Sequence, residues 1–302
     1  MPLNLGKIAC AVVPLLVVTS QMQVTARRLQ LPASNTGIAR IFLTASAKGA
    51  SRVVLQDMEL SAVVDEAPAQ VRTLRPAKDE PLLFALLVDV SRSSAKSANA
   101  ADSKKEAAFQ LFQRLSTGQN QGYLALFNQR LAISKTPLAV SQAKQALDGA
   151  TFTGGTAVFD AVEQTCRKKL SRSGNSGRPR RLILLISDGE DNSSHVTNRQ
   201  AEKAALEEGV SVFSIVTKSY LGPTPGATFM KEFSHRTGGF STETDPETDL
   251  KQAVQLSLAS IEAQWELTLS AASPADRKLH SMQIKCKQKD VHISAPSDAV
   301  LE

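Results

Sequence analysis

The spacing of apolar residues divides the chain into a central part of one kind and two flanks of another. In the central part, runs of apolar residues alternate with stretches of helical spacing. Residues 82–88 form a continuous apolar run, which is typical of a strand buried on both faces of a parallel sheet. Residues 101–115 then carry apolar side chains three and four positions apart, which predicts an amphipathic helix.

This alternation continues to residue 263 and predicts a doubly wound, mostly parallel, Rossmann-like α/β sheet of six strands. After the first strand, the predicted strands are residues 122–127, 131–134, 181–186, 210–216 and 239–242. After the first helix, the predicted helices are residues 141–147, 157–170, 198–208, 227–236 and 249–263.

The two flanks place apolar residues at nearly every second position, which is the pattern of half-buried strands. Each flank is too short to bury a core of its own, so we expect the two to meet as one small, β-rich, sandwich-like accessory unit. The runs that predict these strands are residues 38–44, 60–64, 71–74, 265–269 and 282–287, and we expect a turn over residues 66–68.

The first residues have the pattern of an export signal. Lys7 precedes an apolar run over residues 8–19, and residues 18–20 supply small side chains for a cleavage site. That run is too short to span a bilayer, and no later segment is long and apolar enough. We therefore expect an exported protein, periplasmic or extracellular, with no transmembrane segment in the mature chain. The expected divisions are 1–20 as a signal peptide, 21–37 as a flexible lead-in, 38–78 as a β-rich accessory segment, 80–263 as the α/β domain and 264–302 as a C-terminal β segment.

Composition narrows the range of partners. The 302 residues include 35 Lys and Arg against 29 Asp and Glu, and the formal net charge is +6. The basic runs lack the interleaved aromatic residues of nucleic-acid-binding modules, so no nucleic-acid partner is expected. Removal of the signal would leave two cysteines, Cys166 and Cys286, which are either paired in an oxidising compartment or separate buried thiols.

A set of hard oxygen ligands follows the first central strand. Asp89, Ser91 and Ser93 occupy alternate positions directly after residues 82–88. In open α/β sheets, ligands bind at the carboxyl ends of the strands. One carboxylate and two hydroxyls turned inward at such a place suit Mg²⁺, or alternatively Mn²⁺ or Ca²⁺.

Two later segments bring further oxygen atoms toward the same edge. Thr156 follows a pair of glycines that permit a close backbone approach, and it opens the helix predicted over residues 157–170. Asp188 ends the apolar run of the fourth central strand. In a doubly wound sheet the first and fourth strands are neighbours, so Asp89 and Asp188 should face one another. A bound cation would remove the cost of burying two like charges together.

Asp89-x-Ser91-x-Ser93, then Gly154-Gly155-Thr156, then Ser187-Asp188-Gly189 in that order resembles the metal-ion-dependent adhesion site of von Willebrand factor A domains. The resemblance covers roughly residues 81–263, and the flanks resemble those of bacterial exported proteins of this family. It implies that Ser91, Ser93 and often Thr156 touch the metal through hydroxyls, while Asp89 and Asp188 act mostly through bound water. It also implies an open coordination position that accepts an acidic side chain from a protein partner.

The hydroxyl-rich donor set favours binding over catalysis, because it leaves the metal electrophilic toward an incoming carboxylate. We therefore expect a metal-dependent protein-binding module and not an enzyme. Two alternatives stay open. A metal-dependent hydrolase of phosphoesters could use Asp89 as its nucleophile, although such sites usually carry a second acid where this chain has Ser91. A metal-free structural scaffold would act through its β segments instead.

Other candidate residues are expected to lie in loops. A Ser–His–Asp hydrolase is not supported, because no Gly-x-Ser-x-Gly elbow occurs in the chain. His195 is the histidine nearest to Asp188 in sequence, and we expect it to be a loop residue. Glu190 and Asp191 are expected to belong to a solvated loop after the strand. The identity of the partner and the oligomeric state are not predicted.

Overall fold

The structure is a computed structural model that describes residues 36–47, 53–95, 97–172, 178–217, 224–244 and 250–302. These residues all belong to one compact unit, Pro32–Glu302. The predicted signal peptide and nearly all of the lead-in lie outside the described residues. Within the described residues, no helix is long and apolar enough to cross a membrane.

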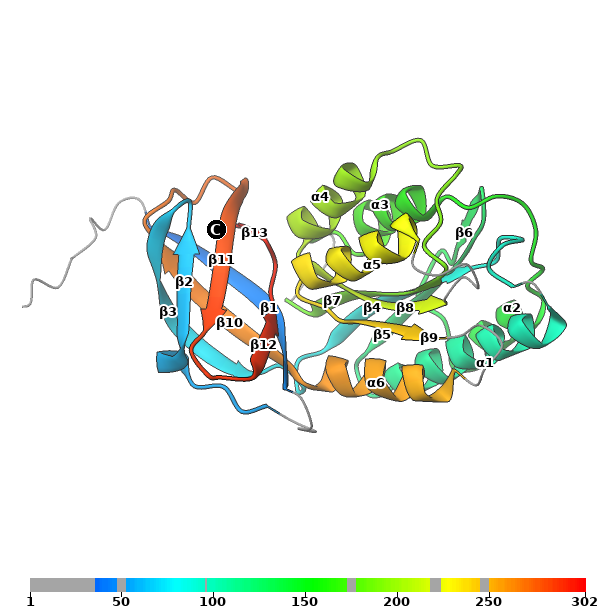
Figure 1. The fold of residues 1–302 in the computed structure, drawn as a ribbon, viewed down its shortest axis with the longest axis horizontal. Coiled ribbons are helices and arrows are strands. Elements are labelled where there is room, and N and C mark those ends of the chain that lie inside the picture. The colour runs from blue at the N-terminus through cyan, green and yellow to red at the C-terminus, as the bar shows by residue number, and fades with distance from the viewer. Residues whose placement is uncertain (1–35, 48–52, 96, 173–177, 218–223, 245–249) are drawn as a thin grey trace, which may run out of the picture. The chain divides into compact units, whose positions relative to one another are not determined.

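The central sheet is mixed and mostly parallel, as predicted, with the strand order β6-β5-β4-β7-β8-β9 (Figure 1). Only β6 runs antiparallel to its neighbour among these strands. The apolar runs of this sheet lie between two layers of helices, so β4 and β8 are buried along their whole lengths, and β7 is buried except at the half-buried Arg181. The strands are β4 (Leu82–Asp89), β5 (Gln121–Phe127), β6 (Leu131–Ile133), β7 (Arg180–Ser187), β8 (Val210–Thr217) and β9 (Ser241–Thr244).

Helices cover both faces of this sheet, and alternate side chains of β4 enter two separate cores (Figure 1). Phe84 and Leu86 pack against one layer, while Leu83 and Leu87 pack against the other. The first layer consists of α1 (Ala98–Leu115), α2 (Val140–Asp148) and α6 (Lys251–Glu262). The second consists of α3 (Val158–Lys169), α4 (Asn198–Glu208) and α5 (Pro225–Arg236).

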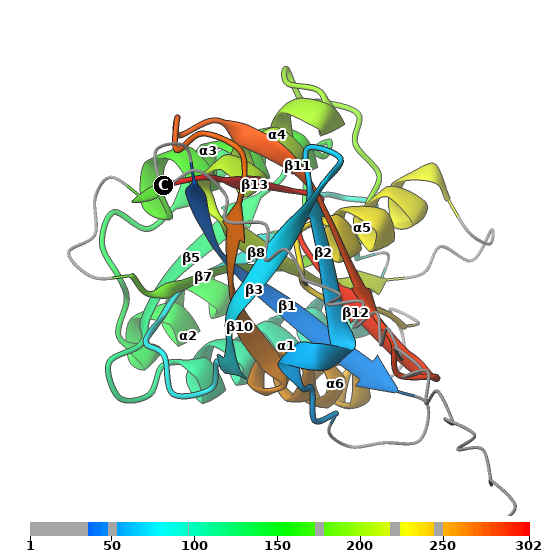
Figure 2. The same cartoon turned by 90° about the vertical axis from the view of Figure 1, so that its left-hand side faces the viewer.

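The flanks of the chain meet in a second sheet, as predicted, with the order β12-β1-β10-β3-β2-β11-β13. Its strands form one continuously paired sheet that curls around its own core (Figure 2). Ile38 and Glu302 exchange two backbone hydrogen bonds of 2.9 Å, which join the residues after β13 to β1. The strands are β1 (Gly37–Ala47), β2 (Leu60–Val64), β3 (Ala67–Pro76), β10 (Gln264–Ala271), β11 (Leu279–Cys286), β12 (Val291–Ser294) and β13 (Asp298–Val300).

The α/β domain enters and leaves the second sheet through two adjacent strands. β3 precedes the domain, β10 follows it, and the two pair antiparallel with Pro76 opposite Trp265. The backbone nitrogen of Ala77 also donates to the carbonyl of Gln264 at 2.9 Å. Both crossings between the sheets therefore lie side by side.

Strand β1 is buried on both faces, because its second face packs against the α/β domain. Ile41 and Leu43 enter the core of the second sheet. On the other face, the hydroxyl of Thr44 donates to the carbonyl of Gly238 at 2.8 Å. Gly238 has φ of +80°, and a Cβ atom there would lie 2.3 Å from the carbonyl oxygen of Phe42. Only glycine permits this approach of the two backbones.

The structure corrects the position of the first hairpin turn. We expected the turn over residues 66–68, but Ala67 already belongs to β3 and the turn consists of Asp65 and Glu66. Their φ angles are +46° and +65°, as two-residue hairpin turns require. The sequence lacks the glycine that normally marks such a turn, so the pattern pointed to the following proline, Pro68, instead.

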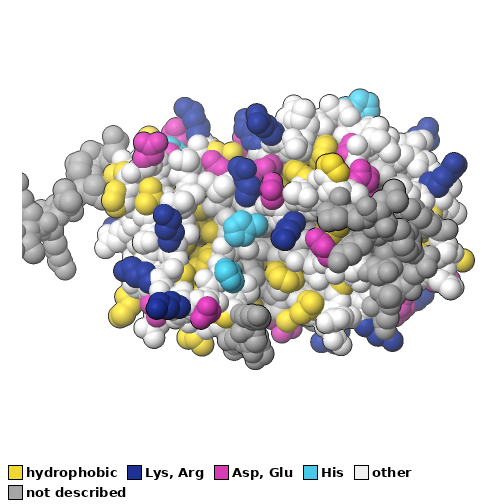
Figure 3. Space-filling model, in the orientation of Figure 1, with side chains coloured by type: hydrophobic (Ala, Val, Ile, Leu, Met, Phe, Trp, Pro, Cys, Tyr) yellow, Lys and Arg dark blue, Asp and Glu magenta, His cyan; other side chains and the backbone are white. Residues whose placement is uncertain are grey.

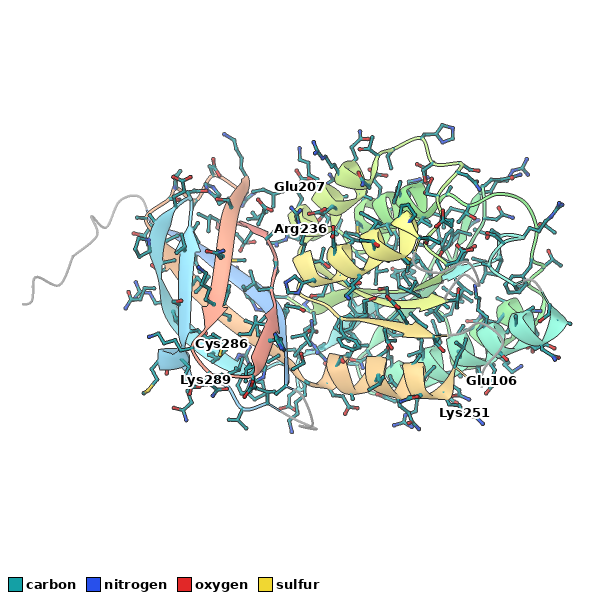
Figure 4. The ribbon with its side chains drawn as sticks, viewed as in Figure 1. Glu106, Glu207, Arg236, Lys251, Cys286 and Lys289 are labelled. Carbon is teal, nitrogen blue, oxygen red and sulfur yellow. The ribbon has the colours of Figure 1, made fainter. Side chains whose placement is uncertain are left out.

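The two cysteines are not paired. Cys166 is a buried free thiol in α3, and Cys286 is a half-buried free thiol at the end of β11 (Figure 4). Of the two alternatives that the sequence left open, the structure supports separate thiols.

Basic side chains do not gather into a single large patch on the face shown in Figure 3. Lys and Arg residues alternate there with Asp and Glu residues. This interspersion agrees with a mildly basic solvated surface.

A histidine bridges two carboxylates where β11 lies beside the first hairpin turn. His280 Nδ1 lies 2.6 Å from Asp65 Oδ2, and His280 Nε2 lies 3.0 Å from Asp276 Oδ1. Burial lowers the pKa of His280, but its hydrogen bonds with both carboxylates outweigh burial and raise the pKa above its usual value. The hydrogen bond with His280 likewise lowers the pKa of Asp65, and it helps to bring the pKa of Asp276 to about 2.

We expect His280→Gln to destabilise the protein more at about pH 5.5 than at about pH 8.5. A histidine whose pKa is raised by folding contributes stability that is complete below its unfolded-state pKa and is lost as pH rises through the folded-state pKa. The carboxylates have lowered pKa values, so they stay charged across this range. Urea denaturation of both proteins at the two pH values measures the difference. An equal loss of stability at the two pH values would contradict a charged bridge between His280 and the two carboxylates.

Candidate metal centre

Asp89 ends β4 as a fully buried carboxylate that two donors hold in place. Its Oδ1 accepts a hydrogen bond of 2.8 Å from the backbone nitrogen of Ser91. Its Oδ2 accepts one of 2.6 Å from the hydroxyl of Ser187. Because β4 pairs in parallel with β7 and Val88 lies opposite Ile186, Asp89 is adjacent to Ser187.

The loop after β4 presents two hydroxyls side by side. Ser91 Oγ lies 3.3 Å from Ser93 Oγ, with Ser91 buried and Ser93 exposed. Ser94 fixes the loop, because its hydroxyl donates to the carbonyl oxygens of Asp89 at 2.8 Å and Ser91 at 3.1 Å. The alternation of Asp89, Ser91 and Ser93 thus yields the adjacent oxygen atoms that the sequence predicted.

The loop that carries Thr156 is bonded directly to this first loop. Thr153 N donates to Val90 O at 2.8 Å, and Arg92 N donates to Gly154 O at 3.2 Å. Gly154 has φ of +79°, a backbone conformation that favours glycine. A Cβ atom on Gly155 would lie 2.5 Å from Ser193 Oγ, so this residue must also be small.

Thr156 contributes a buried hydroxyl without a partner. Its Oγ1 makes no hydrogen bond among the described residues, although Thr156 is completely buried. Its backbone nitrogen, in contrast, is bonded to Asn192 Oδ1 at 2.9 Å. A buried hydroxyl that lacks a partner is costly, so an unpaired one at the predicted site is consistent with a ligand atom there.

Asp188 follows β7, next to the end of β4, and is half-buried. Its Oδ1 accepts a hydrogen bond of 3.1 Å from the backbone nitrogen of Glu190. Burial raises the pKa of Asp188, and the negative charge of Asp89 raises it further; the Ser93 hydroxyl and Lys104 act in the opposite direction. Two neighbouring carboxylates therefore share a poorly solvated edge of the sheet, as expected from the strand order.

The structure thus brings the predicted residues to one edge of the sheet, where three loops meet. The residues are Asp89, Ser91, Ser93, Thr156 and Asp188. Two buried hydroxyls, one exposed hydroxyl and two carboxylates form a hard oxygen set, and one of the hydroxyls lacks a partner. This donor set fits a divalent cation such as Mg²⁺. Within the described part of the chain, no cluster of three or more His, Cys, Asp or Glu side chains has metal-ligand geometry.

Lys104 is a residue of this region that the sequence analysis missed. It lies on the buried face of α1, and its Nζ has no hydrogen-bond partner among the described residues. Burial lowers the pKa of Lys104, whereas Asp89 and Asp188 raise it, so the lysine is near enough to sense both carboxylates. The helical spacing indicates only that Lys104 lies between Ala100 and Ala108 on the apolar stripe of the helix.

Ser187 was also missed as a site residue. The sequence indicates Ser187 only as the first residue of the Ser-Asp-Gly motif. In the structure its hydroxyl donates a hydrogen bond of 2.6 Å to Asp89 Oδ2. Aligning the ends of the two apolar runs would have placed Ser187 beside Asp89, because parallel neighbours end at the same edge.

Asp191 and His195 have structural partners. Glu190, which was predicted to belong to a solvated loop, is instead half-buried, and its Oε1 makes no hydrogen bond among the described residues. Asp191 Oδ2 accepts hydrogen bonds from Phe159 N at 3.1 Å and from Ser194 Oγ at 2.6 Å, so it holds its loop against the first turn of α3. His195 lies in an exposed loop, as expected; its Nδ1 is 2.8 Å from Asp160 Oδ2, and its side chain is 90% exposed. These contacts account for Asp191 and His195 without a bound ligand.

Neither the family models nor the curated proteins contain a match to this chain. Solved structures do match. A von Willebrand factor type A protein from Catenulispora acidiphila has a TM-score of 0.51 and 11% identity, over 88% of this chain and 74% of that one. Proximal thread matrix protein 1 from the mussel byssus, with a zinc-occupied MIDAS motif, has a TM-score of 0.52 and 17% identity. That match covers 64% of this chain and 48% of the mussel protein.

BatB from Bacteroides thetaiotaomicron, a conserved hypothetical protein, matches with a TM-score of 0.47 and 17% identity, over 60% of this chain and 98% of that one. The chain thus spans about half the length of the mussel protein and nearly all of BatB. Together with the strand order, the two matches above a TM-score of 0.5 show the von Willebrand factor A fold that the order of the motifs predicted.

We expect Ser187→Ala to lower the free energy of unfolding by about 2 kcal/mol, because a hydrogen bond to a buried charged group is worth about 1.5–3 kcal/mol. The substitution removes one of the two donors that hold the Asp89 carboxylate. Urea denaturation without added metal measures the loss. Ser141→Ala, at an exposed position in α2, is the matched control and should change stability by less than about 0.5 kcal/mol. Equal stability of the two variants would contradict the role of Ser187.

Proposed function

We propose that this chain is a metal-dependent protein-binding module of an exported protein. In this proposal Ser91, Ser93 and Thr156 offer hydroxyls to a divalent cation, while Asp89 and Asp188 supply the negative charge. The cation accepts a carboxylate from an acidic side chain of a protein partner. The observation that carries the proposal is the buried, unpartnered hydroxyl of Thr156, in a loop bonded to the loop of Ser91 and Ser93.

The donor set supports binding in preference to catalysis. Only two carboxylates belong to it, so a bound cation would keep more of its charge for an incoming carboxylate than an acidic phosphoryl-transfer site would allow. Mg²⁺ suits these oxygen atoms best, and Mn²⁺ and Ca²⁺ are the alternatives. The zinc in the MIDAS motif of the mussel protein supports a divalent ion of some kind. The apolar run near the first residue supports export.

A second candidate is a metal-free scaffold, and Lys104 is the observation that favours it. Its buried ammonium already offsets part of the charge of Asp89 and Asp188. A protein that carries its own internal cation has less to gain from a bound metal. The two candidates differ in a measurable quantity, the stabilisation that a divalent cation confers.

We expect Mg²⁺ or Mn²⁺ to raise the thermal stability of the native protein and to have little effect on Asp89→Ala. A ligand present at a hundred times its dissociation constant stabilises the folded state by about 2.7 kcal/mol. Thermal denaturation with each metal, and with a chelator, measures this response.

Thr156→Val is the companion variant, because it keeps the shape of the side chain and removes the unpartnered hydroxyl. Without metal it should be at least as stable as the native protein, and with metal its stabilisation should be smaller. A native protein that does not respond to any of the metals would contradict the proposal and favour the scaffold. Turnover of a simple phosphoester that requires the metal would favour a hydrolase.

We expect Lys104→Met to tighten Mn²⁺ binding by about tenfold or more, because a like charge in a poorly screened interior costs a cation on the order of 1–2 kcal/mol. The variant should also be less stable than the native protein in chelator, because two carboxylates then lose their internal counter-charge. Isothermal titration measures the affinity. Lys105→Met is the control, since Lys105 bonds the carbonyl of Asp148 on the outside of α1. Unchanged Mn²⁺ affinity in Lys104→Met would exclude this coupling.

A further inference from the structure

A cavity of about 250 Å³ lies where the first residues of β7 and β8 meet strand β1 of the second sheet. Four arginines line it: Arg40, Arg172, Arg178 and Arg181. It lies at the opposite end of β7 from Asp188, so it is separate from the candidate metal centre. The seven residues from Arg181 to Asp188 span about 23 Å in an extended strand.

The cavity has more positive than negative groups in its lining. Its acids are Asp298 and Glu302, against four arginines. Glu302 is shared by two of the arginines, with Arg172 Nη1 at 3.4 Å and Arg178 Nη2 at 3.1 Å. Asp298 Oδ2 accepts a hydrogen bond of 2.7 Å from Ser297 Oγ. The carboxylates of the lining therefore do not balance its guanidinium groups.

Arg40 is neutralised from outside the cavity. Its Nη2 lies 2.6 Å from Glu266 Oε2 and 3.4 Å from Glu80 Oε2, and neither acid belongs to the lining. Arg40 Nη1 donates to the carbonyl of Arg178 at 2.7 Å. Because its guanidinium group already has these partners, Arg40 is the lining arginine that is least available to a ligand.

Arg181 lines the cavity without a direct ionic partner among the described residues. Among the described residues it makes no ion pair within 4.0 Å, and its buried Nε has no hydrogen-bond partner. The Nε of Arg172 is likewise buried without a partner. Burial lowers the pKa of Arg181, and the charges of Arg172 and Arg40 lower it further, whereas Glu208 and Glu302 raise it. The cavity therefore holds like charges close together, and nearby carboxylates offset them only in part. A bound anion would relieve that repulsion.

We propose that this cavity binds a small multivalent anion, a phosphorylated or dicarboxylic molecule, with Arg181 as its main contact and Arg172 and Arg178 beside it. The planar guanidinium group suits both phosphate and carboxylate, because it donates two parallel hydrogen bonds to either. Phe42, Leu206 and Val210 give the cavity an apolar wall for the body of the molecule.

The size of the cavity restricts the ligand. A volume of about 250 Å³ corresponds to about eight water molecules at about 30 Å³ each. It falls just below the range of about 300–1,000 Å³ for pockets that hold drug-sized ligands. A small metabolite therefore fits this cavity.

The ligand would also join the two sheets. Arg40 and Phe42 belong to β1, whereas Arg181 and Val210 belong to β7 and β8. An anion between them would contact both sheets, so its binding should raise the temperature of unfolding.

The test titrates the full chain with inorganic phosphate and, separately, with succinate, at constant ionic strength and with a chelator present. Isothermal titration and thermal denaturation are the readouts. We expect saturable binding of at least one anion, and the tighter of the two identifies the head group. Arg181→Gln should weaken that binding at least tenfold, and Arg178→Gln, at a side chain that is 69% exposed, should weaken it several-fold. Arg114→Gln, at an exposed position in α1, should leave it unchanged.

The absence of saturable binding by either anion would overturn the proposal, as would an affinity that both Arg181→Gln and Arg178→Gln leave unchanged. If Arg181→Gln does not fold, Arg178→Gln alone decides, because a substitution at an exposed side chain leaves the fold intact. Asp89→Ala should bind the anion as the native protein does. The proposals of an anion site and of a metal site can therefore be contradicted independently of one another.

Discussion

The parallel pairing of β4 with β7 is the constraint on which the candidate site depends. Both strands are continuous apolar runs that are buried on both faces, and their register brings Asp89 beside Ser187 and Asp188. Neighbouring strands lie about 4.8 Å apart, so two carboxylates at their ends are held together whatever else the loops do. The rest of the site consists of groups that offset the repulsion between these two carboxylates.

Three features offset the cost of placing the two carboxylates together. Hydrogen bonds from Ser91 N and Ser187 Oγ satisfy the oxygens of Asp89. Lys104 supplies a positive charge from the buried face of α1. The proposed cation would be the third, and it would share its charge-balancing role with the lysine. In the proposed function, Lys104 would act as an internal cation and would limit how strongly the external cation binds.

The sequence predicted the parts of the fold and of the site that depend on local spacing. Asp89, Asp188 and Thr156 could be placed together because each follows or opens an element whose apolar pattern is clear. Lys104 could not be placed from spacing alone, since a lysine on an apolar stripe normally reaches solvent at its edge. β12 and β13 were missed because they are short and are paired only through residues distant in sequence.

The arginine cavity was beyond sequence analysis for the same reason. Arg40 and Arg181 are 141 positions apart in the printed sequence and belong to different sheets. Only the packing of β1 against the α/β domain brings them to one place. Clusters of like charge that are assembled by tertiary contacts leave no periodic signal along the chain.

The pairing of Pro76 with Trp265 gives the whole α/β domain the topology of a loop in a hairpin. Strands β3 and β10 would be neighbours in the second sheet even if a short turn joined them. Loop-closure entropy grows only slowly with loop length, so an insert of nearly two hundred residues costs the hairpin only about 3–4 kcal/mol more than a turn of a few residues. The accessory sheet is therefore a frame into which the α/β domain is inserted, and a different domain with adjacent termini could occupy the same place.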